Sequence, residues 1–420
     1  MRPGRGLNKI SGGQLGNSRW IVAGLVIALT MSGGGATFAA DDEITLGTTV
    51  PMSGRYVRGG TDTKNGYDLA IRQINKKGGV KIAGKQYRLT ALYYDDQSNP
   101  QRAQQLIEQL IKTDGIKFIL GPYSVSQNQN VQSTVELNKV PMVEAHSVTR
   151  SRRSPRPRYT FAVTAAPDGF FTPALELAAA FSKKFGKRAH DLSIAMATKD
   201  DAFSREVREG VLSDANRLGI ACVIDDQLPE DFADMSATLD KVKALKPDLF
   251  LVSGHESTAM TVISQIEQAG ADVPMVASTH CVKARLALER KGSSQLLFCP
   301  VQWNKSARYK GALFGTGKDF TRLYTSVYGY EPSPESAQAA AAVYVFADAF
   351  KRAQSLEPEK VRDAISTTNL LTFFGPIKFD DRGVNSSKPM LLTQIVDGDF
   401  VLVAPQNWAE REPVIKKAKP

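Results

Sequence analysis

The sequence predicts an α/β protein with two domains of similar topology, each a largely parallel β-sheet covered by helices on both faces. Three observations support this. The chain has 420 residues, which at about 100–200 residues per domain corresponds to two or three domains. Short apolar runs typical of strands alternate along the chain with amphipathic helical stretches. One such unit also recurs later in the sequence in the same register.

The first alternating units lie between residues 44 and 120. A helix is expected over 64–77, because its apolar residues follow helical spacing and Gly78 and Gly79 end it. A second helix is expected from Pro100 to about Lys112, with Asn99 as its N-cap and the proline in the first turn. The expected strands are Ile44–Val50, Tyr87–Tyr93 and Ile116–Leu120.

The same alternation continues beyond residue 190. Three further strands and two helices are expected, and they follow one another as strand, helix, strand, helix, strand. Such an order is typical of a parallel sheet with crossover helices. The strands are Leu192–Ala197, Ile220–Asp225 and Asp248–Ser253, and the helices are Ser204–Leu218 and Ser236–Leu245.

An internal correspondence relates two distant parts of the chain. The landmarks Gly121, Ser124 and the tetrapeptide VPMV at 140–143 are repeated as Gly254, Ser257 and VPMV at 273–276. Each is displaced by 133 positions. This common displacement predicts two lobes of similar topology. Because ligands of open parallel sheets bind beyond the carboxyl ends of the strands, the segments after both glycines and both tetrapeptides are expected to line a cleft that closes by a hinge motion.

The N-terminus has the pattern of a secretory signal peptide. A basic stretch ends at Arg19, an apolar run covers 21–30, and small residues precede Ala39 and Ala40. The apolar run is shorter than the roughly 20 residues that span a bilayer, and cleavage is expected near Ala39 or Ala40. The alternative is an uncleaved anchor helix. The cleavage region has no cysteine, so it offers no acceptor for a lipid anchor. The mature protein is therefore expected in the periplasm.

Charge and cysteine content limit the possible partners. The net charge is +10, and four basic residues within 1–40 account for part of it, leaving +6 beyond them. The only dense basic run, from Arg150 to Arg158, is interpreted as a solvated loop, so nucleic acid is not an expected partner. Of three cysteines, Cys281 and Cys299 are the favoured disulfide pair, because each follows a short apolar strand and these strands can lie side by side. Three buried thiols are the alternative.

Catalytic and metal-binding patterns are absent from the sequence. There is no G-x-S-x-G nucleophile elbow, and the four histidines contain no pair spaced i, i+4. The segment from Gly311 to Lys318 has one residue too many for a phosphate-binding loop, and Asp319 stands where serine or threonine is required. We therefore expect a protein that is not an enzyme and has neither a cofactor nor a metal site.

Several motifs occur in a characteristic order along the chain: Ile44–Gly54, Gly66–Asn75, Asp95–Pro100, Ile119–Ser124, Asp200–Ser204, Tyr328–Pro332 and Phe374–Phe379. Together they resemble one known family, the leucine/isoleucine/valine-binding proteins, which are type I periplasmic solute-binding proteins of ABC importers. The resemblance covers about residues 43–405. It implies the type I fold, with two Rossmann-like lobes joined by three crossovers near Val163, Pro300 and Lys388 and a ligand cleft between the lobes. The implied boundaries are a signal peptide at 1–40, lobe 1 at 43–163 plus 301–388, lobe 2 at 164–300 plus 389–406, and a tail at 407–420.

The resemblance also implies the residues that bind the ligand's carboxylate. In the family, a serine after the G-P-Y-type turn and residues after the next strand hold this group. The family serine falls on Val125, so Ser124 or Ser126 takes its place, while Ala145 and Ser147 match the second pair. Anion capture of this kind uses N–H groups at a helix N-terminus. All these serines could instead be helix caps.

Positions in the second lobe differ more from the family. An aromatic position matches Phe203, which is either a stacking surface for the ligand or a packing residue. A tyrosine position matches His255, which, like His280, is either a ligand contact or an exposed loop residue. The acid that pairs with an amino acid's ammonium falls on Thr279, so either Glu256 replaces it or the ligand has no ammonium. The family tyrosine near Gly54 falls on Gly59, leaving room for Tyr56. Trp303 is either a wall of the cleft or part of the core.

The resulting expectation is a monomeric periplasmic solute-binding component of an ABC importer. It captures a small amino-acid-like or carboxylate-bearing solute by hinge closure, and permease subunits recognise the closed form. One alternative is a sensor subunit for a receptor kinase. Another is an importer component for aromatic acids or amides rather than amino acids.

Overall fold

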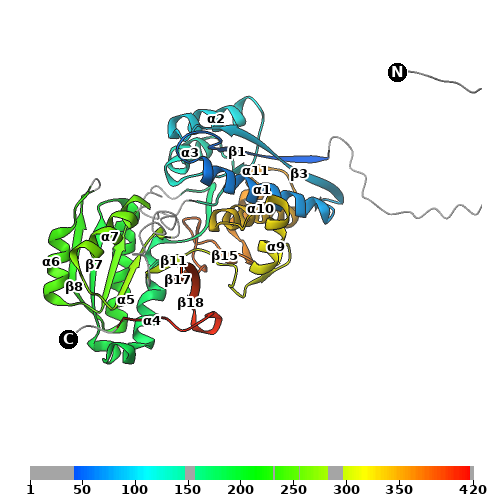
Figure 1. Cartoon of the computed structure of the whole chain (residues 1–420). Helices are drawn as coiled ribbons and strands as arrows, with labels where there is room; N and C mark the ends of the chain where they lie inside the picture. The colour runs from blue at the N-terminus through cyan, green and yellow to red at the C-terminus, as the bar shows by residue number, and fades with distance from the viewer. Residues whose placement is uncertain (1–41, 147–156, 230–231, 255, 282–296, 417–420) are drawn as a thin grey trace, which may run out of the picture. The chain divides into compact units, whose positions relative to one another are not determined.

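The computed structural model describes residues 42–146, 157–229, 232–254, 256–281 and 297–416 (Figure 1). It contains two seven-stranded, mostly parallel sheets, each packed against helices, and this confirms the α/β class. Among the described residues, no helix is both long and apolar enough to cross a membrane.

The first sheet has the strand order β16-β6-β5-β4-β1-β3-β2. All neighbouring strands pair in parallel except β2, which forms an antiparallel hairpin with β3. In sheet order, the strands are β16 (Val384–Asn385), β6 (Thr160–Ala165), β5 (Met142–Glu144), β4 (Ile119–Leu120), β1 (Glu43–Val50), β3 (Lys85–Asp95) and β2 (Val80–Ile82).

Six helices accompany the first sheet. They are α1 (Val57–Lys76), α2 (Pro100–Lys112), α3 (Val125–Leu137), α9 (Gly317–Tyr328), α10 (Pro334–Ala353) and α11 (Pro358–Ser366). Helix α1 packs along α10, where a Cβ on Gly66 would clash with the carbonyl oxygen of Ser336, so only glycine allows this approach. The apolar faces of α1 and α10 share one core with Leu46 and Phe118.

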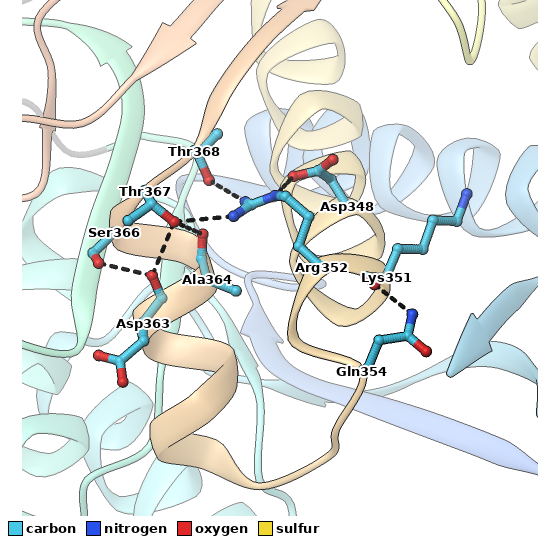
Figure 2. A network of polar contacts seen from close by, with 9 residues as sticks. All are labelled: Asp348, Lys351, Arg352, Gln354, Asp363, Ala364, Ser366, Thr367 and Thr368. Atoms are coloured by element: carbon cyan, nitrogen blue, oxygen red, sulfur yellow. Dashed lines mark hydrogen bonds and ion pairs between the residues drawn. The ribbon is translucent and has the colours of Figure 1, made fainter. Parts of the chain in front are cut away.

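Arg352 joins helix α10 to the segment that follows α11 (Figure 2). Its guanidinium donates to Asp348 Oδ2 (2.6 Å), Thr367 Oγ1 (3.1 Å) and Thr368 Oγ1 (3.1 Å). Lys351 on the same helix turn accepts a bond from Gln354 through its carbonyl oxygen. These contacts use Arg352 for structure, so this basic residue is not a candidate for ligand binding.

The second sheet has the order β18-β17-β11-β10-β9-β7-β8. Strands β7 to β11 run parallel, while β17 and β18 are antiparallel additions at one edge. The strands are β18 (Asp399–Ala404), β17 (Leu391–Val396), β11 (Phe298–Val301), β10 (Met275–Ser278), β9 (Leu249–Ser253), β7 (Ser193–Lys199) and β8 (Ala221–Leu228).

Helices lie on both faces of the second sheet. Helices α4 (Thr172–Ala180) and α5 (Ala202–Leu218) bury Leu175 and Val207 in one core. Helices α6 (Ser236–Leu245) and α7 (Glu256–Ala269) bury Leu239 and Val262 in another. Alternate residues of β7 and β9 point into the two cores, which explains why both strands are continuously apolar. Two short hairpins, β12 (Lys310–Gly311) with β13 (Gly315–Thr316) and β14 (Asn369–Thr372) with β15 (Gly375–Lys378), complete the strands.

The internal correspondence is present in the structure. The unit β4-α3-β5 in the first sheet matches β9-α7-β10 in the second. Strands β5 and β10 begin at Met142 and Met275, which are separated by the predicted 133 positions. The two sheets therefore contain equivalent parallel units.

Several element boundaries differ from the expectation. Helices α2 and α6 have the expected bounds, and Asn99 Oδ1 accepts the Arg102 N–H as an N-cap. Helix α1 begins seven residues earlier than expected, at Val57. Its first turns contain Gly59 and Gly60, and glycine has a low intrinsic helix propensity. A Cβ at Gly60 would clash with the Pro51 carbonyl oxygen, so this position requires glycine for packing. Tertiary packing therefore extends the helix over residues whose intrinsic propensity is unfavourable.

The predicted disulfide is confirmed. Cys281 and Cys299 are bonded, with 5.8 Å between their Cα atoms. The pairing of β10 with β11 places these cysteines together, as the sequence suggested. Cys222 is a half-buried free thiol.

Gln302 connects the three segments by which the chain passes between the sheets. Its side chain accepts the Ala165 N–H (2.9 Å) and donates to the Ala165 carbonyl oxygen (3.3 Å). Its own carbonyl oxygen accepts a bond from Lys388 Nζ (2.6 Å). Ala165 ends β6, Gln302 follows β11, and Lys388 lies between β16 and β17. The assignment of the chain to lobes 1 and 2 at the boundaries given above remains a prediction.

Candidate ligand-binding site

The turn after β4 presents the N-terminus of α3. Ser124 is the N-cap of this helix, and Gln127 Oε1 accepts bonds from the backbone N–H and the hydroxyl of Ser124 (both 3.0 Å). Asn128 Nδ2 donates to the carbonyl oxygens of Pro122 (2.6 Å) and Ser124 (2.8 Å). Ser124 thus acts as a cap in this structure. Ser126 lies in the first turn of α3, and its side chain is outside the described residues.

Tyr123, rather than Tyr56, occupies the space that Gly59 leaves. A Cβ on Gly59 would clash with the ring of Tyr123, which is 8 % exposed. Tyr56 lies next to that ring, edge to face at 6.1 Å between centroids, and is the N-cap residue of α1. The expectation that Tyr56 fills this space is therefore corrected: the ring comes from the turn after β4.

The strand β5 leads to the buried residues Ala145 and His146. Ala145 is fully buried and belongs to the core of the first sheet. His146 packs edge to face on Tyr123 (5.0 Å), and its ring nitrogens lie 2.9 Å from Thr63 Oγ1 and 3.2 Å from Gln338 Oε1. These contacts fix the end of β5. Ser147 follows directly and lies outside the described residues.

Three rings gather at the carboxyl ends of strands in the second sheet. Phe203 follows β7 at the start of α5, His280 follows β10, and Phe170 follows the short helix η1 (Pro167–Gly169). Phe203 packs edge to face on Phe170 (5.0 Å) and on His280 (5.2 Å). His280 Nδ1 lies 2.8 Å from the Gly254 carbonyl oxygen, so it carries the proton and donates. Phe170 and Phe203 are 6 % and 7 % exposed and belong to the core of the second sheet, whereas His280 is half-buried; we call these three residues the aromatic cluster.

Thr279 holds two strand ends together. Its hydroxyl donates to the Gly254 carbonyl oxygen (2.6 Å) and accepts the Gly254 N–H (3.0 Å). The side chain is fully buried. Thr279 therefore has a structural role, and the neighbouring His280 is the more exposed residue of the two. His255 lies outside the described residues, and Glu256 begins α7 with a side chain that is likewise not described.

The acids beside Phe203 have protein partners. Asp201 is the N-cap of α5 and accepts the Ser204 N–H through Oδ1 (2.8 Å). Asp200 forms an ion pair with Arg205. Both carboxylates therefore already have partners within the protein.

Trp303 lies in the core. It is 4 % exposed and packs edge to face on Phe320 (5.8 Å) and Phe373 (6.4 Å). Of the two predicted positions, a wall of the cleft or the core, Trp303 therefore occupies the core. The described residues include no group of three or more His, Cys, Asp or Glu that could hold a metal ion.

Sequence reasoning missed part of this arrangement. Phe170 and Tyr123 were not predicted as site residues, and His146 entered only the search for a metal-binding pair, whereas His280 was predicted to be either a ligand contact or an exposed loop residue. His280 and His146 had a detectable signal, because each directly follows one of the repeated strands. Phe170 had no signal in the sequence, because its contact with Phe203 depends on the position of η1 in the folded chain.

Two open parallel sheets, with polar and aromatic residues beyond their strand ends, define the class of two-lobed solute-binding proteins. The chain belongs to the periplasmic binding protein family, whose model matches residues 43–399. It is accordingly a binding protein and not an enzyme.

Individual relatives are distant but extend over nearly the whole chain. The chain is 22% identical over 407 residues to Leu/Ile/Val-binding protein homolog 8 of Brucella suis biovar 1, covering 94% of this chain and 98% of the relative. The structure matches a leucine binding protein from Thermotoga maritima with a TM-score of 0.69 and 20% identity, covering 87% of this chain and 99% of that one. It also matches an ABC transporter solute binding protein from R. palustris in complex with benzoate, with a TM-score of 0.65 and 15% identity, covering 86% and 95%.

Proposed function

We propose that this protein is the periplasmic solute-binding component of an ABC importer and that its ligand is a small planar carboxylate. Family membership supports the binding role, and the matched R. palustris protein is a solute binding protein of an ABC transporter. The leader at 1–40 supports export to the periplasm. Partners are the permease subunits, which recognise the closed form of a monomer.

The aromatic cluster is the observation that carries the choice of ligand. Phe170, Phe203 and His280 form adjoining ring edges and faces within 5.0–6.4 Å of one another. Aromatic side chains favour another ring in offset or edge-to-face contact by about 0.5–1.5 kcal/mol beyond area burial. A planar ligand gains this interaction, whereas an aliphatic side chain gains only burial.

The surroundings of the cluster do not favour an amino acid. The position of the family's ammonium-binding acid is Thr279, whose hydroxyl is engaged with Gly254. Asp200 and Asp201 have their own partners. Because burying a cation without a counter-charge is costly, an α-ammonium lowers affinity unless Glu256 turns toward it.

Closure of the two lobes is the proposed mechanism. Ser147 and the N-terminus of α3 bind the carboxylate from the first lobe, and the aromatic cluster binds the ring from the second. Both sets of contacts exist together only in the closed form, so the ligand shifts the population toward closure. The permease then recognises closure rather than the ligand itself.

Calorimetric titration of the mature protein with benzoate, benzamide and leucine tests the ligand class. Benzoate is expected to bind tightest, and Phe203→Leu is expected to weaken it about fivefold or more, consistent with a loss of about 1 kcal/mol. Phe185→Leu is the matched control, because Phe185 packs on the same core from η2 (Ser182–Phe185). If leucine bound at micromolar concentration, Glu256→Gln abolished this binding and benzoate did not bind, the ligand would be an amino acid and the proposed ligand class would be wrong.

A further inference from the structure

A cavity of about 690 Å³ lies beside the segments that connect the two sheets. Its walls come from the end of β6, the short helix η1, the whole length of α4, the segment between β16 and β17, and the residues after β18. This volume is in the usual range of small-molecule sites, about 300–1,000 Å³. None of the residues considered above for the proposed ligand lines it.

The cavity combines apolar walls with one buried amine. Leu177, Met390, Leu391 and Pro405 contribute apolar surface. Lys388 also lines the cavity and is only 5 % exposed. A buried lysine among apolar residues is rare in proteins unless it is paired, because its charge loses hydration.

The partners of Lys388 are uncharged. Its Nζ donates to the carbonyl oxygens of Gln302 (2.6 Å) and Pro389 (3.2 Å), and it lies over the rings of Phe374 (4.6 Å) and Tyr309 (5.6 Å). It forms no ion pair with any residue in the described part of the chain. An ammonium has three N–H donors, so one donor has no acceptor and the positive charge has no counter-ion among the described residues. Burial lowers the pKa of Lys388 to about 7.

Two carboxylates and a phenol share the cavity with Lys388. Glu176 on α4 is paired with Arg217 (2.9 Å), and Asp168 on η1 also has an interaction partner. Tyr309 lines the cavity, and its hydroxyl forms no hydrogen bond with the residues that the structure describes. Among the lining residues, Thr172, Asn385 and Ser386 already donate to protein oxygens, and the amides of Gln406 and Asn407 lie on exposed residues. The Lys388 amine and the Tyr309 hydroxyl are donors with unused capacity, while the acids of the lining are already partnered.

We propose that this cavity is a second small-molecule site, which binds an amphipathic monocarboxylate with its head group on Lys388 and Tyr309 and its apolar tail along Leu177, Met390 and Leu391. The carboxylate supplies the counter-charge that the protein does not provide. Binding is therefore coupled to protonation of Lys388. Because Lys388 also bonds Gln302, which bonds Ala165, an occupant contacts the chain segments that move when such a protein closes.

Calorimetric titration of the mature protein with octanoate, octanol and octylamine tests this proposal. Octanoate is expected to bind at least tenfold more tightly than either analogue. With a pKa of about 7, Lys388 is about nine-tenths neutral at pH 8, so octanoate is expected to take up close to one proton there, measured in two buffers of different ionisation enthalpy.

Variants separate this site from the proposed ligand site. Lys388→Met is expected to weaken octanoate at least tenfold and to abolish proton uptake, and Tyr309→Phe is expected to weaken it severalfold. Lys305→Met, which removes an exposed lysine paired with Glu331, is the charge-matched control and leaves octanoate binding unchanged. Unchanged octanoate binding in Lys388→Met, equal binding of octanol, or no octanoate binding at millimolar concentration would overturn the proposal. Because benzoate is also a monocarboxylate, the variants separate the two proposals: Lys388→Met is expected to leave benzoate binding unchanged, and Phe203→Leu is expected to leave octanoate binding unchanged.

Discussion

The buried amine of Lys388 has a measurable effect on stability, which Lys388→Met removes. The pKa of Lys388 falls from 10.5 to about 7 on folding because burial disfavours the charge. Between these values the unfolded chain binds more protons than the folded one, so the wild type gains stability relative to the variant as pH rises. Below pH 7 the full penalty of the buried charge is present. It decreases as pH rises toward 10.5.

The expected size follows from the two pKa values. Linkage gives a penalty of roughly 4–5 kcal/mol at pH 6 and roughly 2 kcal/mol at pH 9, a difference of about 2.5 kcal/mol. Loss of the two hydrogen bonds to Gln302 and Pro389 costs about 1 kcal/mol each, at both pH values. The change between pH 6 and pH 9 therefore reports the amine alone.

Urea unfolding of wild type and Lys388→Met at pH 6 and pH 9 measures this difference. The stability of the variant relative to wild type is expected to be about 2.5 kcal/mol higher at pH 6 than at pH 9. Lys305→Met is expected to show no such change, because its side chain is 47% exposed. If the relative stability of Lys388→Met were the same at both pH values, the reasoning about the buried amine would be refuted.

Three further predictions concern packing, the disulfide and export. Gly59→Ala is expected to displace Tyr123 and to lower the free energy of unfolding by about 1–3 kcal/mol, measured by thermal unfolding. Gly169→Ala is the control and is expected to change stability little, because a Cβ there meets nothing within 4 Å. Equal melting points for both variants would contradict this prediction. Replacing Cys281 and Cys299 by serine opens a loop with a sequence separation of 18 and is expected to lower the free energy of unfolding by about 3 kcal/mol; a change below 1 kcal/mol would count against a stabilising bond. Intact-mass measurement of the exported protein is expected to show cleavage near Ala39 or Ala40, and a soluble form that retains Trp20 would argue against a signal peptide.

Local signals in the sequence were sufficient for much of the fold. The N-cap Asn99 with Pro100 marked the start of α2, because capping is a property of a few adjacent residues. The repeated tetrapeptide located β5 and β10, because equivalent strands require equivalent apolar residues. The start of α1 was not predicted, because Gly59 and Gly60 suggested a loop. These glycines instead allow close contacts with Tyr123 and Pro51, which form only in the folded chain.

The site was less predictable than the fold. The family resemblance proposed Phe203 as a site residue, and it lies in the first turn of the helix after β7. The contact of Phe170 with Phe203 depends on η1, and the cap role of Ser124 depends on the Gln127 side chain, so neither follows from spacing. The burial of Lys388 likewise arises from residues far away in sequence, including Gln302 and Tyr309.

The affinity of the mature protein for benzoate, compared with leucine by calorimetry at pH 7, tests the central claim most directly. The proposed site predicts that benzoate binds and that leucine binds at least tenfold more weakly, because the aromatic cluster favours a ring and the nearby acids Asp200 and Asp201 are already engaged. Leucine binding that is tighter than benzoate binding and unaffected by Phe203→Leu would contradict the claim.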